Sequence, residues 1–152
     1  MSRFQPLIAA LIIAGAVLGG ARVSAAAPLD LSAYRGHVVY LDFWASWCGP
    51  CKQSFPWMRS MQKTYARRGL VVVAVDLDAH PQDAARFLVQ FRPNFRIVYD
   101  PSGSLARKFK VAGMPTSLVI GPHGRVRDRH IGFIPADAPQ YERQVERLLA
   151  SK

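Results

Sequence analysis

Cysteine is scarce in this chain, because only two of its 152 residues are cysteines, Cys48 and Cys51. A framework of several disulfides is therefore excluded, and a closed zinc site would need two further ligands beside this pair. The natural candidates are the four histidines, but no two of them have the spacing of zinc ligands. They are His37, His80, His123 and His130. The sequence therefore predicts no metal site.

Acidic residues are also few, since 10 Asp and Glu stand against 20 Lys and Arg, which gives a net charge of +10. Such a balance can indicate a nucleic-acid or membrane partner. The basic residues are scattered, however, and base-stacking aromatics do not alternate with them. The densest run, RVRDRH, places Arg125, Arg127 and Arg129 as on one face of an exposed edge strand, where charge prevents pairing with another sheet. We therefore expect no nucleic-acid partner.

A hydrophobic run long enough to span a membrane is missing. The apolar stretch from Leu7 to Leu18 is shorter than the roughly 20 residues that a spanning helix needs. It follows one positive charge and precedes small residues that fit signal-peptide cleavage near Ala25. We expect residues 1–25 to be a signal peptide, with an uncleaved anchor as the alternative, and residues 26–152 to form the folded domain. The domain would then work in the periplasm or elsewhere outside the cytoplasm, where disulfides persist.

Strand and helix patterns alternate along the rest of the chain. The runs VVYLDFWA (38–45) and LVVVAVDLD (70–78) are typical of buried parallel strands. Helices are predicted at 48–69, 81–91 and 135–150, with a short strand at 95–100 and a short helix after it. A Gly-Pro-His-Gly turn joins two further strands within residues 116–132 as a hairpin. This order predicts an α/β fold with a central mixed sheet flanked by helices.

The two cysteines lie between a predicted strand and a predicted helix. A disulfide across so short a loop constrains the unfolded chain by only about 2 kcal/mol, so a purely structural role explains little. A redox role explains the neighbours as well. Cys48 would lie at the helix start, where free N–H groups stabilise a thiolate, and Cys51 would be shielded one turn further on. Gly49 lets the chain bend, and Pro50 fits the first turn, where its missing N–H does no harm.

The segment DFWASWCGPCKQSFP (42–56) resembles the active-site segment of the thioredoxin superfamily, and GMPT (113–116) resembles its cis-proline loop. An extra strand–helix segment at about 77–100 and the export signal are most similar to the TlpA/ResA-like branch of extracytoplasmic thiol–disulfide oxidoreductases. The resemblance implies a thioredoxin-like fold in which Cys48 attacks and Cys51 resolves the mixed disulfide. It also implies a cis peptide bond before Pro115 and a Met114 backbone that pairs with a substrate strand.

The same resemblance implies protein thiols and disulfides as substrates, a membrane electron donor, a monomer and no cofactor. The Gly-Pro pair between the cysteines resembles that of reducing thioredoxins, so we expect a reductant, in cytochrome c maturation or similar thiol delivery. The alternatives are a disulfide oxidant or isomerase, and a non-enzymatic basic or metal-delivering module of this fold.

One position departs from the branch. Many TlpA/ResA-like proteins carry a buried glutamate near the dithiol, whereas both glutamates of this chain lie in its last predicted helix. Asp42 is the lone charge of an apolar strand, and a buried carboxylate there would have a raised pKa and could accept a proton from Cys51. The superfamily resemblance supports this role, because proteins of the superfamily have an acid at this position. The alternative is a strand-end aspartate bonded to backbone N–H groups.

A substrate-binding surface is expected beside the dithiol, with Trp47 half-exposed in it. Its predicted residues are Trp47, Gly49, Pro50, Gly113, Met114 and Gly132. Trp44 is expected in the core. His123, in the hairpin turn, and His130, on the edge strand, are expected at the surface.

Overall fold

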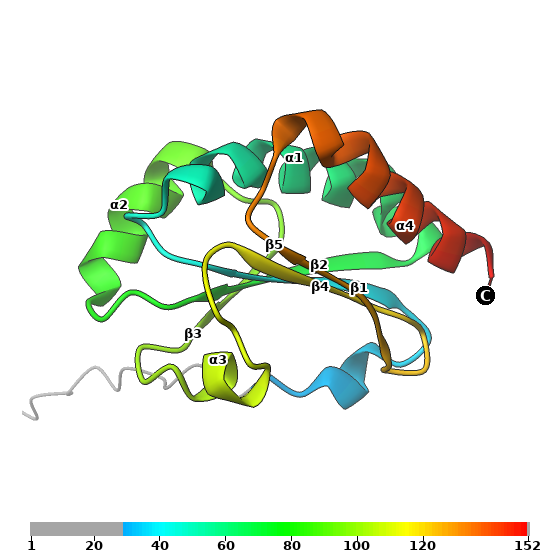
Figure 1. Ribbon diagram of the computed structural model, residues 1–152, viewed down its shortest axis with the longest axis horizontal. Coiled ribbons are helices and arrows are strands. Elements are labelled where there is room, and N and C mark those ends of the chain that lie inside the picture. Colours follow the sequence, from blue (N-terminus) through cyan, green and yellow to red (C-terminus); the bar gives the residue numbers. More distant parts are fainter. Residues whose placement is uncertain (1–28, 152) are drawn as a thin grey trace, which may run out of the picture.

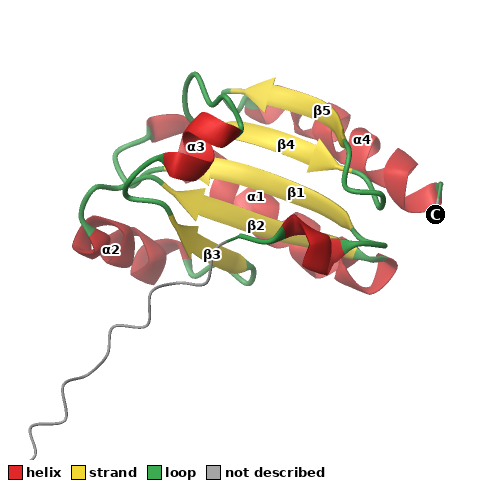
Figure 2. Cartoon of the chain, turned by 90° about the horizontal axis from the view of Figure 1, so that it is seen from below, coloured by secondary structure: helices red, strands yellow, loops and turns green. Residues whose placement is uncertain are grey.

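A five-stranded mixed sheet organises residues 29–151, the part of the chain that the computed structural model describes (Figure 1). Its strands are β1 (Val38–Trp44), β2 (Leu70–Asp76), β3 (Arg96–Tyr99), β4 (Thr116–Ile120) and β5 (Val126–Ile131). Their order in space is β3-β2-β1-β4-β5 (Figure 2). The first three strands pair in parallel, whereas β4 runs antiparallel to β1 and β5 antiparallel to β4. The mixed sheet predicted from the sequence is confirmed, and the predicted signal peptide lies outside the described residues.

Helices cover both faces of the sheet (Figure 1). One face carries α1 (Gly49–Tyr65), α2 (Pro81–Phe91) and α4 (Ala138–Ala150). The other carries α3 (Ser104–Lys108) and the 3-10 helix η1 (Leu31–Tyr34). Two short 3-10 turns, η2 (Ala66–Arg68) and η3 (Pro135–Asp137), precede β2 and α4. The extra segment predicted at about 77–100 forms α2 and β3.

β1 lies in the centre of the sheet because its sequence, VVYLDFW, is almost wholly apolar, and all of its residues are buried. Successive side chains of a strand point to opposite faces. Tyr40 and Trp44 therefore join the core beneath α1, whereas Leu41 and Phe43 join the core above α3. By the same alternation, Asp42 points to the face that α1 covers.

Three aromatic rings join β1, α1 and α2. The centroid of the Trp44 ring lies 4.8 Å from that of Phe55 and 4.6 Å from that of Phe87, and the last two are 4.7 Å apart. Trp44 is fully buried, as predicted from the sequence. Such pairs add to the free energy of burial through their edge-to-face geometry, so this cluster fixes the start of α1 against β1.

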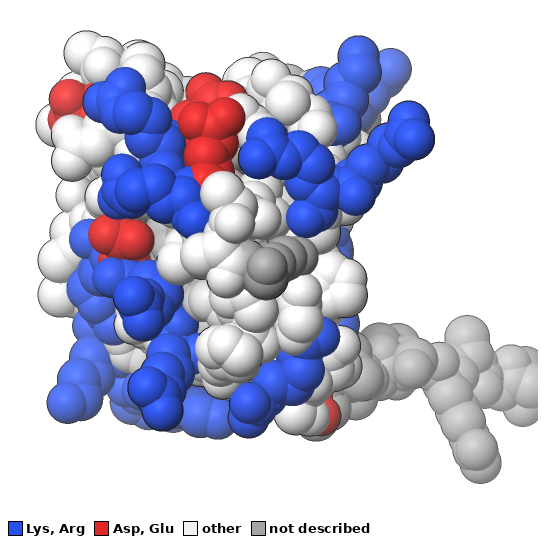
Figure 3. All heavy atoms as spheres, turned by 90° about the vertical axis from the view of Figure 1, so that its right-hand side faces the viewer, with Lys and Arg blue, Asp and Glu red and all other residues white. Residues whose placement is uncertain are grey.

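Basic side chains gather at the end of the sheet where β1 begins, and Figure 3 views the molecule from this side. Arg35 donates from Nη1 to the carbonyl oxygen of His123 at 3.0 Å. Arg125 and Arg127 line a pocket of about 360 Å³ together with Leu148. These arginines are therefore remote from the end of the sheet where β1 enters α1. The edge position and exposed arginines of β5 were predicted from the sequence and are confirmed.

We predict that Phe55→Ala lowers the free energy of unfolding by about 3–5 kcal/mol, because it removes a fully buried ring from the aromatic cluster. Val89→Ala is the control, since Val89 is 74% exposed on α2 and its truncation should change stability by less than about 0.5 kcal/mol. Urea melts measure both. A loss below about 1 kcal/mol for Phe55→Ala would contradict the packing of its ring against Trp44 and Phe87.

Candidate active site

The two cysteines lie at the junction between β1 and α1. β1 ends at Trp44, and the Cys48 N–H donates to the Ala45 carbonyl oxygen at 3.1 Å, which turns the chain into the helix. Cys48 and Cys51 form a disulfide, with their Cα atoms 5.3 Å apart. Cys48 is 4% exposed and Cys51 is fully buried, so Cys48 is the sulfur nearer to solvent.

Cys48 is the N-cap residue of α1. Its Sγ accepts a hydrogen bond from the Cys51 N–H at 3.2 Å, so a backbone donor of the first turn points at this sulfur. The first turn contains no acidic residue, and Pro50 lies in it as predicted. A helix N-terminus stabilises negative charge, so this placement favours a thiolate at Cys48 over one at Cys51. A Cβ built on Gly49 would meet no atom within 4 Å, which leaves open space beside the dithiol.

Asp42 is fully buried on β1, two residues before Trp44. The Ser117 hydroxyl donates to its Oδ1 at 2.5 Å, whereas its Oδ2 is buried without a hydrogen-bond partner. Burial raises the pKa of Asp42 to about 7, and the Ser117 hydrogen bond opposes that rise. The expected raised pKa is thus found, and a hydroxyl, rather than backbone N–H groups, is the partner of the carboxylate.

The loop before β4 approaches the dithiol through the pairing of β1 with β4. That pairing ends with Phe43 opposite Thr116, so Pro115 lies one residue beyond it, level with Trp44. The Met114–Pro115 peptide bond is cis, as predicted from the sequence. Met114 is half-buried and packs against the core cluster that contains both cysteines.

Two glycines of the predicted surface adjoin this loop. The Gly132 N–H donates to the Pro115 carbonyl oxygen at 2.7 Å, and the φ of +82° at Gly132 lies in the region that favours glycine. A Cβ built on Gly113 would lie 3.9 Å from Cγ2 of Ile131. The structure thus brings the loops around Pro115 and Gly132 together.

Exposed apolar side chains lie next to Cys48 and next to Gly132 in the chain. Trp47 is 70% exposed, more than the half-exposed state expected from the sequence. Ile131 and Ile134 are 65% and 56% exposed, and sequence reasoning missed both. The run HIGFI could have indicated their exposure, because it is mostly apolar and yet continues from a charged edge strand. A surface of this kind suits an apolar protein segment better than a small polar molecule.

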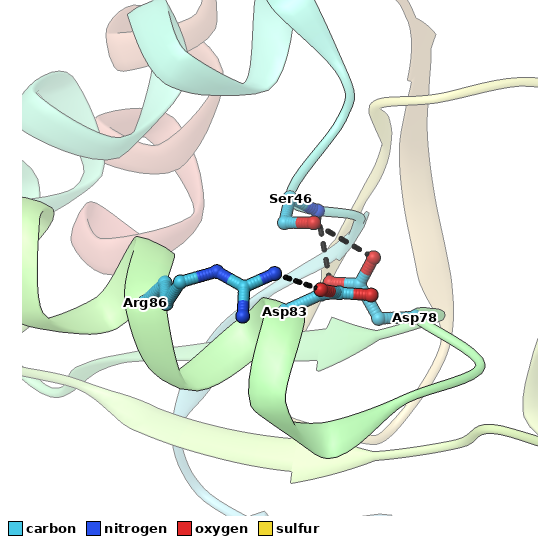
Figure 4. A network of polar contacts seen from close by, with 4 residues as sticks. All are labelled: Ser46, Asp78, Asp83 and Arg86. Atoms are coloured by element: carbon cyan, nitrogen blue, oxygen red, sulfur yellow. Dashed lines mark hydrogen bonds and ion pairs between the residues drawn. The ribbon is translucent and has the colours of Figure 1, made fainter.

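A second acidic group near the dithiol was also missed. Asp78 accepts hydrogen bonds from the backbone N–H and the hydroxyl of Ser46, both at 2.9 Å, and so holds the loop that leads to Cys48 (Figure 4). Burial, and also the carboxylate of Asp78, raise the pKa of Asp76 above its usual range. Both aspartates end the run LVVVAVDLD, and parallel strands end at the same edge of a sheet. That pattern could have placed them beside the active-site loop.

An ion pair lies on α2 near this loop. Asp83 and Arg86 form it, and both line a pocket of about 230 Å³ together with Ser46 (Figure 4). Within residues 29–151, no group of three or more His, Cys, Asp or Glu side chains could hold a metal ion. The helices of the same residues are all too short or too polar to cross a bilayer.

The profile of the Redoxin family matches residues 23–145. The thiol-disulfide oxidoreductase ResA of Oceanobacillus iheyensis is 32% identical over 121 residues, which cover 74% of this chain and 63% of that protein. The chain thus spans less than two thirds of the length of the curated relatives it matches first.

Solved structures of thiol–disulfide exchange proteins are also similar to this chain. A candidate thiol:disulfide interchange protein DsbE of Chlorobium tepidum has a TM-score of 0.78 at 51% identity, over 80% of this chain and 86% of that one. StoA of Bacillus subtilis has a TM-score of 0.63 at 28% identity, over 72% and 82%. The chain therefore belongs to the Redoxin family, with a thioredoxin-like fold and the TlpA/ResA-like motifs that its sequence resembles.

We predict that Asp42→Asn stabilises the protein above pH 7. The pKa of Asp42 is raised from 3.8 to about 7 on folding, so the folded state holds the proton more tightly than the unfolded state. The neutral carboxyl stabilises the folded state by up to about 4 kcal/mol below about pH 4. This stabilisation is lost as the pH rises to about 7. The asparagine variant should lack this loss. Urea melts at several pH values measure it, and equal pH dependence in both proteins would contradict the raised pKa.

Proposed function

We propose that this protein is a thiol–disulfide oxidoreductase that reduces disulfides in partner proteins outside the cytoplasm. The observation that carries the proposal is the Cys48–Cys51 pair at the start of α1, with a backbone N–H directed at the more accessible sulfur. The Redoxin family assignment and the similarity to ResA support it.

The reaction proceeds in two exchange steps. The Cys48 thiolate attacks a substrate disulfide, so a bond forms between Cys48 Sγ and one substrate sulfur while the other leaves as a thiolate. Cys51, as a thiolate, then attacks Cys48 Sγ. The second substrate sulfur leaves reduced, and the Cys48–Cys51 disulfide forms. A membrane electron donor must afterwards return two electrons to the pair.

Asp42 is proposed as the base for the second step. Cys51 is fully buried, so its thiol needs a proton acceptor close by before it can attack. Cys51 and Phe55 share one face of α1, because they are four residues apart. The Phe55 ring packs on Trp44, and Asp42 points to the same face of β1 as Trp44, beneath α1. The buried, unpartnered Oδ2 of Asp42 can accept the proton.

Substrate binding is assigned to the exposed surface around the dithiol. Trp47 and the loops of Met114–Pro115 and Gly132 border it, and open space lies beside Gly49 and Pro50. We propose that a substrate segment pairs with the Met114 backbone in an extended conformation. The protein is expected to act as a monomer in this step.

The Gly-Pro pair between the cysteines resembles that of reducing thioredoxins and supports the proposed direction of electron flow. The predicted signal peptide supports a place outside the cytoplasm, and the TlpA/ResA-like motifs support a role such as cytochrome c maturation. Relatives named as thiol–disulfide oxidoreductase and thiol:disulfide interchange protein support the exchange reaction itself. The reduction potential of the Cys48–Cys51 pair decides the direction. A value near that of thioredoxin, about −270 mV, supports a reductant, whereas a value near −120 mV would indicate an oxidant.

We predict that Cys51→Ser accumulates covalent complexes with partner proteins, because Cys48 can still attack but nothing resolves the mixed disulfide. Cys48→Ser is the matched control and should trap none. Non-reducing gel electrophoresis followed by mass spectrometry of the bands measures both. Equal trapping by the two variants would reverse or remove the roles assigned to the cysteines.

We also predict that Asp42→Asn slows the second step more than the first, by about 10²–10⁴-fold, since the amide cannot accept the Cys51 proton. The second step in the unaltered protein should accelerate as the pH rises through about 7, where Asp42 becomes a carboxylate. Stopped-flow kinetics of both steps between about pH 6 and about pH 9 measure this dependence. If the second step keeps its rate and pH profile in the variant, the base lies elsewhere.

A further inference from the structure

A row of polar side chains crosses the buried face of the sheet at the level of Asp42. Ser117 on β4 is the direct cross-strand partner of Asp42 on β1, and His130 on β5 is the direct partner of Ser117. Side chains opposite each other on neighbouring antiparallel strands point to the same face, with Cβ atoms about 4.5–5.5 Å apart. The row therefore leads from the centre of the sheet to its edge strand.

The inner half of this row is a hydrogen-bonded pair. The Ser117 hydroxyl donates to Oδ1 of Asp42 at 2.5 Å, and Ser117 itself is only 3% exposed. Since Asp42 is fully buried, water does not reach its carboxylate directly. A proton that Asp42 accepts must therefore leave through a neighbouring side chain.

The outer half of the row is His130, which was expected at the surface and is instead half-buried. Its ring packs against Tyr141 of α4, with the ring centroids 4.5 Å apart. Its Nε2 is buried and has no hydrogen-bond partner. The ring thus has one nitrogen in the interior, while the residue as a whole is partly exposed.

The other titratable groups around Asp42 are buried or already hydrogen-bonded. Burial, and then the charge of Asp42, raise the pKa of Tyr40, and a hydrogen bond with Ser117 opposes that rise, so the phenol borders the row but stays neutral. Tyr141 of α4 and Trp57 of α1 close the region above, with ring centroids 6.0 Å apart. The glutamates of α4, Glu142 and Glu146, accept hydrogen bonds from the Tyr65 hydroxyl at 2.6 and 2.9 Å.

We propose that Ser117 and His130 form the proton path by which Asp42 is returned to its charged form after each catalytic cycle. The proposal deepens the function proposed above and rests on Asp42 acting as the base for Cys51. His130 is then the group that exchanges the proton with solvent, and Ser117 is the positioning residue that connects it to the carboxyl.

The proton balance of this path is simple. Asp42 takes one proton from the Cys51 thiol and becomes neutral, and rotation about its Cβ–Cγ bond, which is a soft torsion, brings the protonated oxygen to Ser117. The Ser117 hydroxyl, which donates to Asp42 at rest, turns to Nε2 of His130 and gives it its proton, while the carboxyl donates to Ser117 Oγ. Asp42 is left as a carboxylate, Ser117 is unchanged, and His130 is protonated on both ring nitrogens until the nitrogen other than the buried Nε2 releases a proton to solvent.

The test uses the reduced full-length protein and an aromatic disulfide that releases a coloured thiolate, dithiobis(nitrobenzoate). The first release reports the mixed disulfide at Cys48, and the second reports its resolution by Cys51. Stopped-flow traces are recorded from about pH 6 to about pH 9 with and without added imidazole.

His130→Ala should slow the second release about 10-fold or more and leave the first unchanged, and imidazole should restore the rate by occupying the vacated space. His130→Phe keeps the ring contact with Tyr141 but has no nitrogen, so it should be slow and should not respond to imidazole. His123→Phe, in the hairpin turn, is the matched control and should behave as the unaltered protein.

Ser117→Ala should also slow the second release and move its pH midpoint above 7, because the hydroxyl stabilises the charged form of Asp42. Ser117→Thr should restore both. The path is overturned if His130→Phe resolves as fast as the unaltered protein at every pH, or if imidazole leaves His130→Ala slow. Absence of a second release in the unaltered protein would instead refute the proposed exchange reaction itself.

Discussion

Burial of β1 on both faces is the constraint on which the rest of the structure depends. With all of its residues buried, the strand needs partners on both sides and helices on both faces. The packing of α1 on one face places its N-terminus, and with it Cys48, directly beyond the end of the strand. The same burial removes Asp42 from water and leaves its carboxylate with a hydrogen bond from the Ser117 hydroxyl. The position of β1 thus determines both where the dithiol lies and why the proposed base is buried.

Buried acids lower the stability of the folded protein. Asp42 has its pKa raised by burial, and so has Asp76, which lies opposite Trp44 at the end of β2. Each charged carboxylate weakens the folded state at neutral pH. The fully buried rings of the aromatic cluster lie beside these acids and provide compensating burial. An acid retained under such conditions is more readily explained by a chemical role than by stability.

Much of the fold could be predicted from the sequence because its signals are local. The apolar runs at 38–45 and 70–78, the Gly-Pro-His-Gly turn and the predicted helix at 81–91 each depend on neighbouring residues, and the structure has them within a few positions. The cysteines and the cis peptide bond before Pro115 followed from motifs that resemble a known family. The hydrogen bonds of Asp78 to Ser46 were missed because they join two loops through the pairing of β1 with β2, 32 residues apart.

The position of His130 was missed for a subtler reason, which is the register of the edge strand. The pairing of β4 with β5 shifts by one residue between Val119 and Ile120, as at a β-bulge. Without that shift, the register would place Arg129 opposite Ser117, since a one-residue slip sends every side chain of a strand to the other face. A guanidinium beside Asp42 would hold the pKa of the carboxyl low and make it a poor base near neutral pH. The shift instead turns Arg129 to the opposite face of the sheet, where it donates to the Phe109 carbonyl oxygen, and brings the His130 imidazole to the row. A single irregularity at the edge of the sheet therefore decides whether its buried centre is electrostatically suited to proton transfer.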